Sequence, residues 1–492
     1  MCIRDRNGAL LIVVADDPNT HSSQNEQDTR VLAEFAKVPL LEPSDVEEAA
    51  KMAYWGMKIS EMFKIPVILR TVTRLSHSRS NIEVEEIKID RKQGKFKKNV
   101  ERWVAVPKHA RKLHIELLEK YERIRSFFEN SNFNNVKIND CDIGIVTSGV
   151  PYWYVAECSE ILSLNPSFFK IGAYPLPEES LKRYMENVKS ILVVEELEDV
   201  IEKHVRILAQ KCGYSGKIYG KDVIPRGGEV DVENIKKAFS HIKEIKVEVF
   251  KKFDSVERAP VLCPGCPHRA TFYLLKRVFG NSAVYSGDIG CYTLGFTTGT
   301  IDTTICMGAS IGIANGLYHA GENVIAVIGD STFYHAGIPA LINAVHNRAE
   351  IVVVILDNGT VAMTGGQPTP ENGIDVMGRK VGKVKIEDVV NGCGVDLAVV
   401  IDPYNIEESM RKLKKVKEGS GVRVVISRRP CVLKLRAFEQ YKVNENCRGC
   451  RKCLELGCPA IEFNAIAKIT SVCTGCGVCA QICPFNAIEV LK

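Results

Sequence analysis

Val324-Ile325-Ala326-Val327-Ile328-Gly329-Asp330-Ser331 is the stretch that decides the fold, because a predicted buried strand ends directly in polar residues. A second apolar run, Ile351 to Leu356, ends in the same way in Asp357-Asn358-Gly359-Thr360. Nearly continuous Val/Ile runs are typical of parallel sheets that are covered on both faces. Such sheets bind ligands beyond the carboxyl ends of their strands, so both polar groups are predicted to lie at one binding edge.

The same alternation of short apolar runs with helical patterns extends along the chain. Further strands are predicted at Ile65 to Arg70, Cys141 to Ser148, Ser190 to Val194 and Val422 to Ser427. The 492 residues are therefore predicted to form an α/β protein with parallel sheets in several domains. The predicted divisions are 1–85, a charged linker with a surface helix at 86–137, 138–250, 255–435, and a cysteine-rich region at 440–492. Arg70, at a strand end, either pairs with an anion or lies on the surface.

Composition excludes several classes of protein. The net charge is only +5, which argues against nucleic acid as the main partner. No apolar run approaches the roughly 18 residues of a membrane helix, and the N-terminus lacks the basic-then-apolar order of a signal peptide, so we expect a cytoplasmic protein without a membrane partner. Eighteen cysteines in such a chain indicate metal or redox chemistry before disulfides.

Two cysteine motifs close the sequence: Cys447-x2-Cys450-x2-Cys453-x4-Cys458-Pro459 and Cys473-x2-Cys476-x2-Cys479-x3-Cys483-Pro484. Three thiolates at this spacing wrap one 4Fe-4S cluster, and the cysteine before proline ligates the other. The first cluster is therefore assigned to Cys447, Cys450, Cys453 and Cys483, and the second to Cys473, Cys476, Cys479 and Cys458. Zinc is the alternative, but a zinc site closes with four ligands and has no use for the Cys-Pro ends. We expect the long x4 spacing to shift a cluster potential or to favour loss of an iron.

Oxygen ligands for Mg²⁺ are available at the binding edge. Asp330 offers a carboxylate, Asn358 an amide oxygen and Thr360 a backbone carbonyl, which leaves positions for two diphosphate oxygens and a water. The pattern resembles the thiamine diphosphate motif, Gly-Asp-Gly followed by Asn-Asn, with Ser331 in place of a glycine and Asp357 before the liganding Asn358. Neither difference removes a ligand. A plain turn is the alternative.

Upstream, Gly308 opens a run of small residues that ends at Gly316. Small side chains allow the backbone to approach a cofactor closely, and close helix packing would explain them equally well. We therefore count Gly308, with Gly329 and Ser331, among the candidate cofactor-binding residues.

A thiamine domain joined to a two-cluster ferredoxin tail resembles the large (alpha) subunit of indolepyruvate:ferredoxin oxidoreductase. The runs that carry this resemblance are Leu262-Cys263-Pro264-Gly265-Cys266-Pro267-His268-Arg269, Gly287-Asp288-Ile289-Gly290-Cys291, Thr364-Gly365-Gly366-Gln367-Pro368, His21 to Asp28, and Ser76-His77-Ser78-Arg79. It implies a multidomain thiamine-diphosphate-binding fold with a C-terminal two-cluster ferredoxin-like α+β domain. Within it, 1–85 would be the remainder of a pyrimidine-binding domain, 138–250 a transketolase-C-like domain, and 255–435 the diphosphate and Mg²⁺ domain.

Met1 to Arg6 is followed at once by a predicted buried strand at Gly8 to Asp17, and this order suggests an N-terminal truncation. By the resemblance, the missing part would carry the glutamate that protonates the aminopyrimidine ring of thiamine. That residue is therefore not assigned.

The resemblance implies oxidative decarboxylation of an aryl 2-oxoacid such as indolepyruvate with coenzyme A, giving an aryl-acetyl-CoA and CO2. Electrons would leave through two 4Fe-4S clusters to ferredoxin, and a smaller beta subunit would complete a heterodimer or heterotetramer. Two alternatives remain: another oxoacid, such as pyruvate, 2-oxoglutarate or a branched oxoacid, or an electron-transfer module with an incomplete thiamine site.

Some roles stay open at this point. By the same resemblance, Cys263, Cys266 and Cys291 could help to bind a third cluster, with Cys393 or Cys306 as fourth ligand; buried or site-lining thiols are the alternative. His268 and His335 are the candidate catalytic residues, because each lies in a predicted cofactor-facing turn where a neutral imidazole could move a proton or hold a substrate carboxylate. A structural, hydrogen-bonded histidine is the alternative for each.

Overall fold

The structure is a computed structural model that describes residues 8–83, 98–248, 256, 259–435 and 439–491. It divides into two compact units, Met1–Asp254 and Ser255–Lys492. Within the described residues, no helix is both long and apolar enough to cross a membrane.

The first sheet of the N-terminal unit has the strand order β1-β3-β2-β7. β1 (Leu11–Asp16), β3 (Val67–Val72) and β2 (Leu40–Leu41) are parallel, and β7 (Ala173–Tyr174) is antiparallel to β2. The expectation that the first strand is fully buried is wrong: β1 is an edge strand, with Ile12 40% and Val13 63% exposed.

Helices cover this first sheet, and one of them comes from the predicted linker. α2 (Val46–Phe63) packs on β3, and α5 (Pro107–Glu129) adds Leu117, Ile124 and Phe128 to the same apolar core. The charged segment is thus more than a solvated connector in its helical part. Its residues 84–97 lie outside the described residues. Shorter helices of this region are η1 (Pro18–Thr20), α1 (Thr29–Ala36), α3 (Thr73–Ser76) and α4 (Val100–Trp103).

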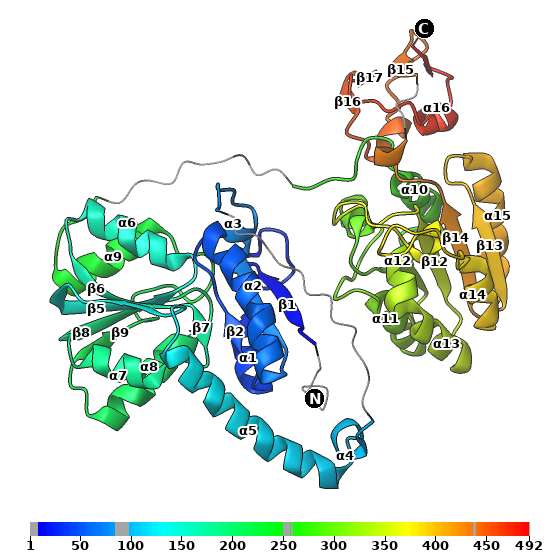
Figure 1. The fold of residues 1–492 in the computed structure, drawn as a ribbon. Helices are drawn as coiled ribbons and strands as arrows, with labels where there is room; N and C mark the ends of the chain where they lie inside the picture. The colour runs from blue at the N-terminus through cyan, green and yellow to red at the C-terminus, as the bar shows by residue number, and fades with distance from the viewer. Residues whose placement is uncertain (1–7, 84–97, 249–255, 257–258, 436–438, 492) are drawn as a thin grey trace. The chain divides into compact units, whose positions relative to one another are not determined.

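The second sheet of this unit has the order β4-β6-β5-β8-β9 and is parallel except for β4. Helices lie on both of its faces, α6 and α9 on one and α7 and α8 on the other (Figure 1). The bounds are β4 (Asn135–Lys137), β5 (Asp140–Ser148), α6 (Pro151–Ile161), β6 (Pro166–Ile171), α7 (Glu178–Met185), β8 (Ser190–Val194), α8 (Val200–Cys212), β9 (Lys217–Tyr219) and α9 (Val232–Lys243).

A buried network of charged side chains joins the ends of these strands. Arg70, which lies inside β3 and not at its end as predicted, donates from Nε to Asp16 Oδ2 at 2.6 Å and also pairs with Glu42. Arg30 pairs with Asp28 at 2.6 Å and with Glu195 at 2.8 Å. Arg70 is 1% exposed, so of the two expectations the anion partner is confirmed and the surface position is wrong.

The C-terminal unit is built on one parallel sheet of order β10-β11-β12-β14-β13. α10 and α15 cover one face, and α11, α13 and α14 cover the other (Figure 1). The bounds are α10 (Pro267–Phe279), β10 (Val284–Ser286), η2 (Cys291–Thr298), α11 (Ala309–His319), β11 (Val324–Gly329), α12 (Asp330–Thr332), η3 (Phe333–Gly337), α13 (Ile338–His346), β12 (Val352–Asp357), η4 (Pro370–Asn372), α14 (Ile386–Gly392), β13 (Leu397–Ile401), α15 (Ile406–Glu418), β14 (Arg423–Arg428) and η5 (Val432–Lys434).

The cysteine-rich module follows on the α10 and α15 face, and its apolar residues share one core with those helices. It contains two small antiparallel sheets, β15 with β18 and β16 with β17. The bounds are β15 (Tyr441–Val443), η6 (Lys452–Leu456), β16 (Ile461–Asn464), β17 (Ile466–Ile469), α16 (Val478–Ile482) and β18 (Ile488–Val490). Every strand predicted from an apolar run is present; the ends of six lie within two residues of the prediction, and β1 begins three residues after the predicted Gly8.

Candidate functional site

Asp330 lies at the carboxyl end of β11, where the chain enters α12. Its Oδ1 accepts a hydrogen bond from the Ser331 amide at 2.7 Å, and its Oδ2 accepts one from the Gly359 amide at 2.9 Å. Burial, together with the neighbouring Asp357, raises the pKa of Asp330 to about 7. A divalent cation at this carboxylate would favour its charged form, so the donor set fits a bound Mg²⁺.

The loop after β12 supplies the other two predicted ligands. Asn358 Oδ1 accepts from the Thr360 amide at 3.0 Å, and Gly359, between them, has a φ of +67° that favours glycine. Because the Gly359 amide also bonds to Asp330, the loops after β11 and β12 are held together. The two predicted polar groups thus meet at one edge of the sheet.

Asp357 binds an arginine side chain. Its Oδ2 accepts from Arg428 Nε at 2.5 Å, across the pair of strands β12 and β14. Arg428 also pairs with Glu387 at 2.6 Å and with Glu371 at 3.0 Å. The aspartate that stands where the motif has its first asparagine therefore anchors the loop through Arg428.

His268, in the first turn of α10, lies beside the loop after β12 that carries Asn358 and Thr360, here called the Mg²⁺ loop. Its Nε2 is 3.4 Å from Asn358 Nδ2, and its ring meets that of Tyr292 edge-on at 6.4 Å. Burial lowers the pKa of His268 to about 4, so the imidazole is neutral at physiological pH and can accept from the amide. Gly329 is tightly packed here, because a Cβ would come within 2.7 Å of the Tyr292 ring.

Gly308 precedes α11 with a φ of +86°, and a Cβ there would lie 2.4 Å from that of Ala336. Its amide donates to the fully buried carboxylate of Asp288 at 3.1 Å, and Ser310 Oγ donates to the same oxygen at 2.8 Å. Close packing therefore accounts for Gly308, whether or not a cofactor lies against it.

His335, the second candidate catalytic residue, lies in the π-helical turn η3 beside Ala336. Its side chain is exposed within the C-terminal unit. A π-helical turn often marks a functional site. No described contact ties His335 to Asp330 or Asn358, so the structure brings His268 to the Mg²⁺ loop and leaves His335 apart from it.

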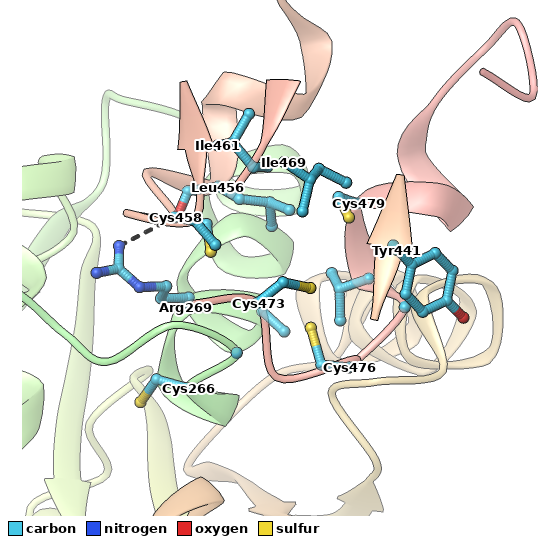
Figure 2. Close-up of a pocket in the computed structure, with 15 residues that line it drawn as sticks. Cys266, Arg269, Tyr441, Leu456, Cys458, Ile461, Ile469, Cys473, Cys476 and Cys479 are labelled. Carbon is cyan, nitrogen blue, oxygen red and sulfur yellow. Dashed lines mark hydrogen bonds between the residues drawn. The ribbon is translucent and has the colours of Figure 1, made fainter. Parts of the chain in front are cut away.

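The cysteines of the tail line two separate cavities. One, of about 350 Å³, is lined by Cys447, Cys450, Cys453 and Cys483. The other, of about 480 Å³, is lined by Cys458, Cys473, Cys476 and Cys479. Figure 2 shows the sulfur atoms of the second set turned toward a common space beneath Ile461 and Ile469. These are the two sets of four that the sequence predicts, including the exchange of the cysteines that precede proline.

The thiols that line these cavities are suited to bind a positively charged metal centre. Burial and the neighbouring thiols raise the pKa of Cys479 to about 12, and they also raise the pKa of Cys453 and Cys476. Thiolates that repel one another need a cationic core between them, which iron supplies in a 4Fe-4S cluster. The four cysteines of each set line a cavity and do not meet at one point: among the described residues, no three His, Cys, Asp or Glu side chains form a group that could hold a metal ion.

Sequence reasoning missed one member of the upstream cysteine group. Burial, with the thiols of Cys263 and Cys291, raises the pKa of Cys266 to about 12. The pKa of Cys291 is in turn raised by burial and by the thiols of Cys431 and Cys263. The fourth cysteine of this group is thus Cys431.

Neither predicted fourth ligand lies in this group. Cys393 packs with the core of the α11, α13 and α14 face, and Cys306 is exposed. The amide of Cys431 donates to the Asn358 carbonyl at 3.1 Å, so the group lies next to the Mg²⁺ loop. Its position after β14, at the same sheet edge as the other loops, was the signal available in the sequence.

Two protein-family models match parts of the chain, and solved structures resemble it more weakly. Residues 288–427 match the family model of the thiamine pyrophosphate enzyme C-terminal TPP binding domain, and residues 466–489 match that of the 4Fe-4S binding domain. A solved 2-oxoglutarate:ferredoxin oxidoreductase from Magnetococcus marinus is 18% identical with a TM-score of 0.32, covering 36% of this chain and 66% of that one.

Curated relatives extend the match to nearly the whole chain. Indolepyruvate oxidoreductase subunit IorA of Archaeoglobus fulgidus is 41% identical over 517 residues, covering 99% of this chain and 82% of that protein. The subunit IorA of Methanothermobacter marburgensis is 40% identical over 502 residues, covering 98% and 81%. That of Pyrococcus abyssi is 42% identical over 535 residues, covering 99% and 82%. The chain therefore belongs to the family of indolepyruvate oxidoreductase subunit IorA, oxidoreductases of 2-oxoacids with a thiamine diphosphate domain and a 4Fe-4S domain.

Proposed function

We propose that this chain catalyses the oxidative decarboxylation of aryl 2-oxoacids, with indolepyruvate as the principal substrate. One indolepyruvate, one coenzyme A and two oxidised ferredoxins would give indoleacetyl-CoA, CO2, a proton and two reduced ferredoxins. The substrate is inferred from the printed names of the relatives, which are about 40% identical to this chain. The redox chemistry is inferred from its own residues.

The start of α10 is the observation that supports this function most strongly. Cys266 lines the cavity of Cys458, Cys473, Cys476 and Cys479, here called the Cys458 set. It also belongs to the upstream group of Cys263, Cys266, Cys291 and Cys431, here called the Cys263 group. Two residues later, His268 contacts Asn358. The thiamine site and the iron–sulfur site are therefore continuous in packing. Electrons released by oxidation at the thiamine site would therefore reach the iron–sulfur site without a mobile carrier.

In this function, Asp330, Asn358 and the Thr360 carbonyl would hold Mg²⁺ and, through it, a diphosphate. Thiamine diphosphate, when bound, supplies the electron sink for decarboxylation. His268 orients the Asn358 amide as a neutral acceptor. Arg428 fixes the base of the same loop through Asp357. His335 is exposed and free to meet the substrate, so we assign it the proton transfer or carboxylate contact that His268 is too buried to make.

Three cysteine sets would form the electron route. The Cys263, Cys266, Cys291 and Cys431 set lies next to the Mg²⁺ loop and would receive electrons first. The Cys458 set shares its cavity wall with Cys266 and would follow. The Cys447 set would pass electrons to ferredoxin. Four cysteines in each set match the ligand number of a 4Fe-4S cluster.

A second subunit would complete the enzyme. The relatives are named as subunits, and we extend this to a smaller beta subunit for the present chain, in a heterodimer or heterotetramer. Coenzyme A would be the acyl acceptor, and we expect the enzyme to work in the cytoplasm.

The direct test is an anaerobic assay of the chain, reconstituted with iron, sulfide, thiamine diphosphate and its partner subunit. Reduction of a viologen dye is followed with indolepyruvate and coenzyme A, and the same assay with pyruvate and 2-oxoglutarate is the control. Faster reduction with indolepyruvate supports the aryl assignment, and reduction with pyruvate alone excludes it. A chain that binds no thiamine diphosphate after reconstitution excludes the catalytic function altogether.

A further inference from the structure

Arg269 belongs to the run Leu262 to Arg269, yet the proposed function gives it no task. Arg269 is only 5% exposed. Nε donates to the carbonyl oxygen of Cys263 at 3.1 Å, and Nη2 donates to that of Leu262. The guanidinium is therefore fixed on the loop that carries two cysteines of the upstream group.

The other end of the same guanidinium reaches the iron–sulfur module. Nη1 donates to the carbonyl oxygen of Gly457 and lies 3.5 Å from that of Leu456. Gly457 immediately precedes Cys458. Figure 2 shows Arg269 beside this segment, with the sulfur of Cys266 turned away from the sulfur atoms of the Cys458 set. Arg269 thus stands between two cysteine sets.

In the part of the chain that the structure describes, no carboxylate balances the charge of Arg269. Among the described residues, the partners of Arg269 are neutral carbonyl groups, and the acidic groups that act on it are the thiols of Cys458, Cys266 and Cys263. A buried cation without a counter-ion is destabilising. Thiolates that bind a cluster carry a net negative charge, so a loaded enzyme would supply the counter-ion that the protein lacks.

We propose that Arg269 is a positioning residue of the electron route, a buried cation shared by two cysteine sets that raises the midpoint potential of the cluster held by Cys458, Cys473, Cys476 and Cys479. The inference rests on the proposed function, because it needs the clusters. Each one-electron reduction adds one negative charge to the cluster, beside a fixed positive charge in surroundings that screen it little. Net charge and hydrogen bonding around a cluster are the terms that set its potential.

Cations near the other tail set differ in exposure. Arg448, Arg451 and Lys452 line the cavity of the Cys447 set, and all three are exposed. Water and salt screen exposed charges strongly. A buried arginine on one side only would therefore make the Cys458 cluster the better electron acceptor of the two and draw electrons from the thiamine site.

The test compares three variants of the full chain, reconstituted with its partner subunit: Arg269→Gln, Arg269→Lys and Arg277→Gln. Arg277 is on the same helix but its side chain is 49% exposed and lies 3.9 Å from Glu455, so it matches the charge change without the burial. The midpoint potential is measured by electron paramagnetic resonance during reduction with dithionite. The signal of the Cys458 cluster is assigned by its change in Cys458→Ser.

We expect Arg269→Gln to lower that midpoint potential, and Arg269→Lys and Arg277→Gln to leave it near that of the unmodified chain. Lysine keeps the charge but cannot span both loops, so a purely structural role would lower the potential in Arg269→Lys as well, and that result would overturn the proposal. An unchanged potential in Arg269→Gln, or an equal fall in Arg277→Gln, would also overturn it.

If Arg269→Gln assembles no cluster, Arg269→Lys decides the matter. A cluster with the original potential supports the role of the charge, and a lowered potential refutes it. An unmodified chain without any 4Fe-4S signal is a different failure, because it removes the proposed function itself.

Discussion

Two neighbouring aspartates, Asp330 and Asp357, lie at the same edge of the C-terminal sheet and are both buried. Asp357 has a cationic partner in Arg428, whereas among the described residues Asp330 accepts hydrogen bonds from backbone amides and has no cationic partner. The elevated pKa of Asp330 follows from this difference, because amide dipoles offset only part of the cost of burying a charge. The residue that lacks a cation in the protein is the one suited to bind one from solution.

Asp330→Asn should weaken cofactor binding while leaving the fold intact, because the amide keeps the size but not the charge of the carboxylate. Loss of an outer-shell partner already costs roughly 10–100-fold in metal affinity, so we expect a loss of at least that size for thiamine diphosphate with Mg²⁺. Isothermal titration calorimetry measures it. Asp375→Asn, at a partly exposed aspartate paired with Arg379, is the control, and an equal loss in that variant would refute the assignment.

The adjacent glutamates Glu195 and Glu196 of the N-terminal unit should respond differently to substitution by glutamine, because Glu195 is paired with Arg30 in a buried ion pair. Burial raises the pKa of Glu196 to about 7, above its value of 4.5 when unfolded. The folded state therefore holds an extra proton between these values, and stability falls as pH rises through this window, by about 3 kcal/mol in full above pH 7. Glu196→Gln should raise the melting temperature at pH 8 and change it little at pH 5.

Glu195 differs because it forms a buried ion pair with Arg30 at 2.8 Å. Glu195→Gln removes one of the two carboxylate partners of Arg30, Asp28 being the other, and should destabilise the unit by up to about 3–5 kcal/mol. Tryptophan fluorescence is a suitable probe, since all three tryptophans, Trp55, Trp103 and Trp153, lie in this unit. Stabilisation by Glu196→Gln that is equal at both pH values would contradict the assigned titration.

At the scale of elements, the predictable part of the fold was the part with a local signal. Apolar runs gave β8 and β11 nearly to the residue, because a strand buried on both faces must be apolar along its length. β1 carries the same apolar pattern but lies at an edge, a fact that depends on which strands pair. β7, two residues long, joins a sheet whose other strands come more than a hundred residues earlier, and no local pattern marks it.

The candidate site shows the same division. Spacing within the tail predicted both cysteine cavities, because the eight residues lie in one short stretch. Cys431 was missed because it meets Cys291 only through the order of strands in the sheet. His268 could be placed in a turn, but its contact with Asn358 depends on how α10 packs against the loop after β12.

Substitutions of the two candidate histidines should have different effects, because the two residues lie on different elements. His268→Phe removes the acceptor beside Asn358 and should weaken the binding of thiamine diphosphate about 10-fold or more, as an outer-shell change does. His335→Phe, on the exposed turn η3, should leave that affinity unchanged and lower kcat with indolepyruvate. Calorimetry and the dye assay distinguish them, and a His335→Phe enzyme with full turnover would remove that residue from the mechanism.

At the scale of the whole molecule, the number of clusters decides whether one chain connects the thiamine site to ferredoxin without a gap. Cys266 belongs to the upstream group and also lines the cavity of the Cys458 set, so a third cluster would lie between the Mg²⁺ loop and the tail. Without it, electrons would have to cross the packed start of α10. The three-set arrangement thus predicts about twelve irons per chain, against about eight for the tail alone.

Cys431→Ser tests this count, because serine is a poor ligand for iron and Cys431 belongs to the upstream group alone. We expect the variant to lose about four irons per chain and to keep both tail clusters. Dye reduction should fall steeply while thiamine diphosphate still binds, since the break lies between the two sites. Cys393→Ser, in the core of the opposite face, is the matched control and should keep the full iron content. Equal iron in Cys431→Ser and the unmodified chain would leave the upstream cysteines as site-lining thiols and would require electrons to pass directly from the thiamine site to the Cys458 set.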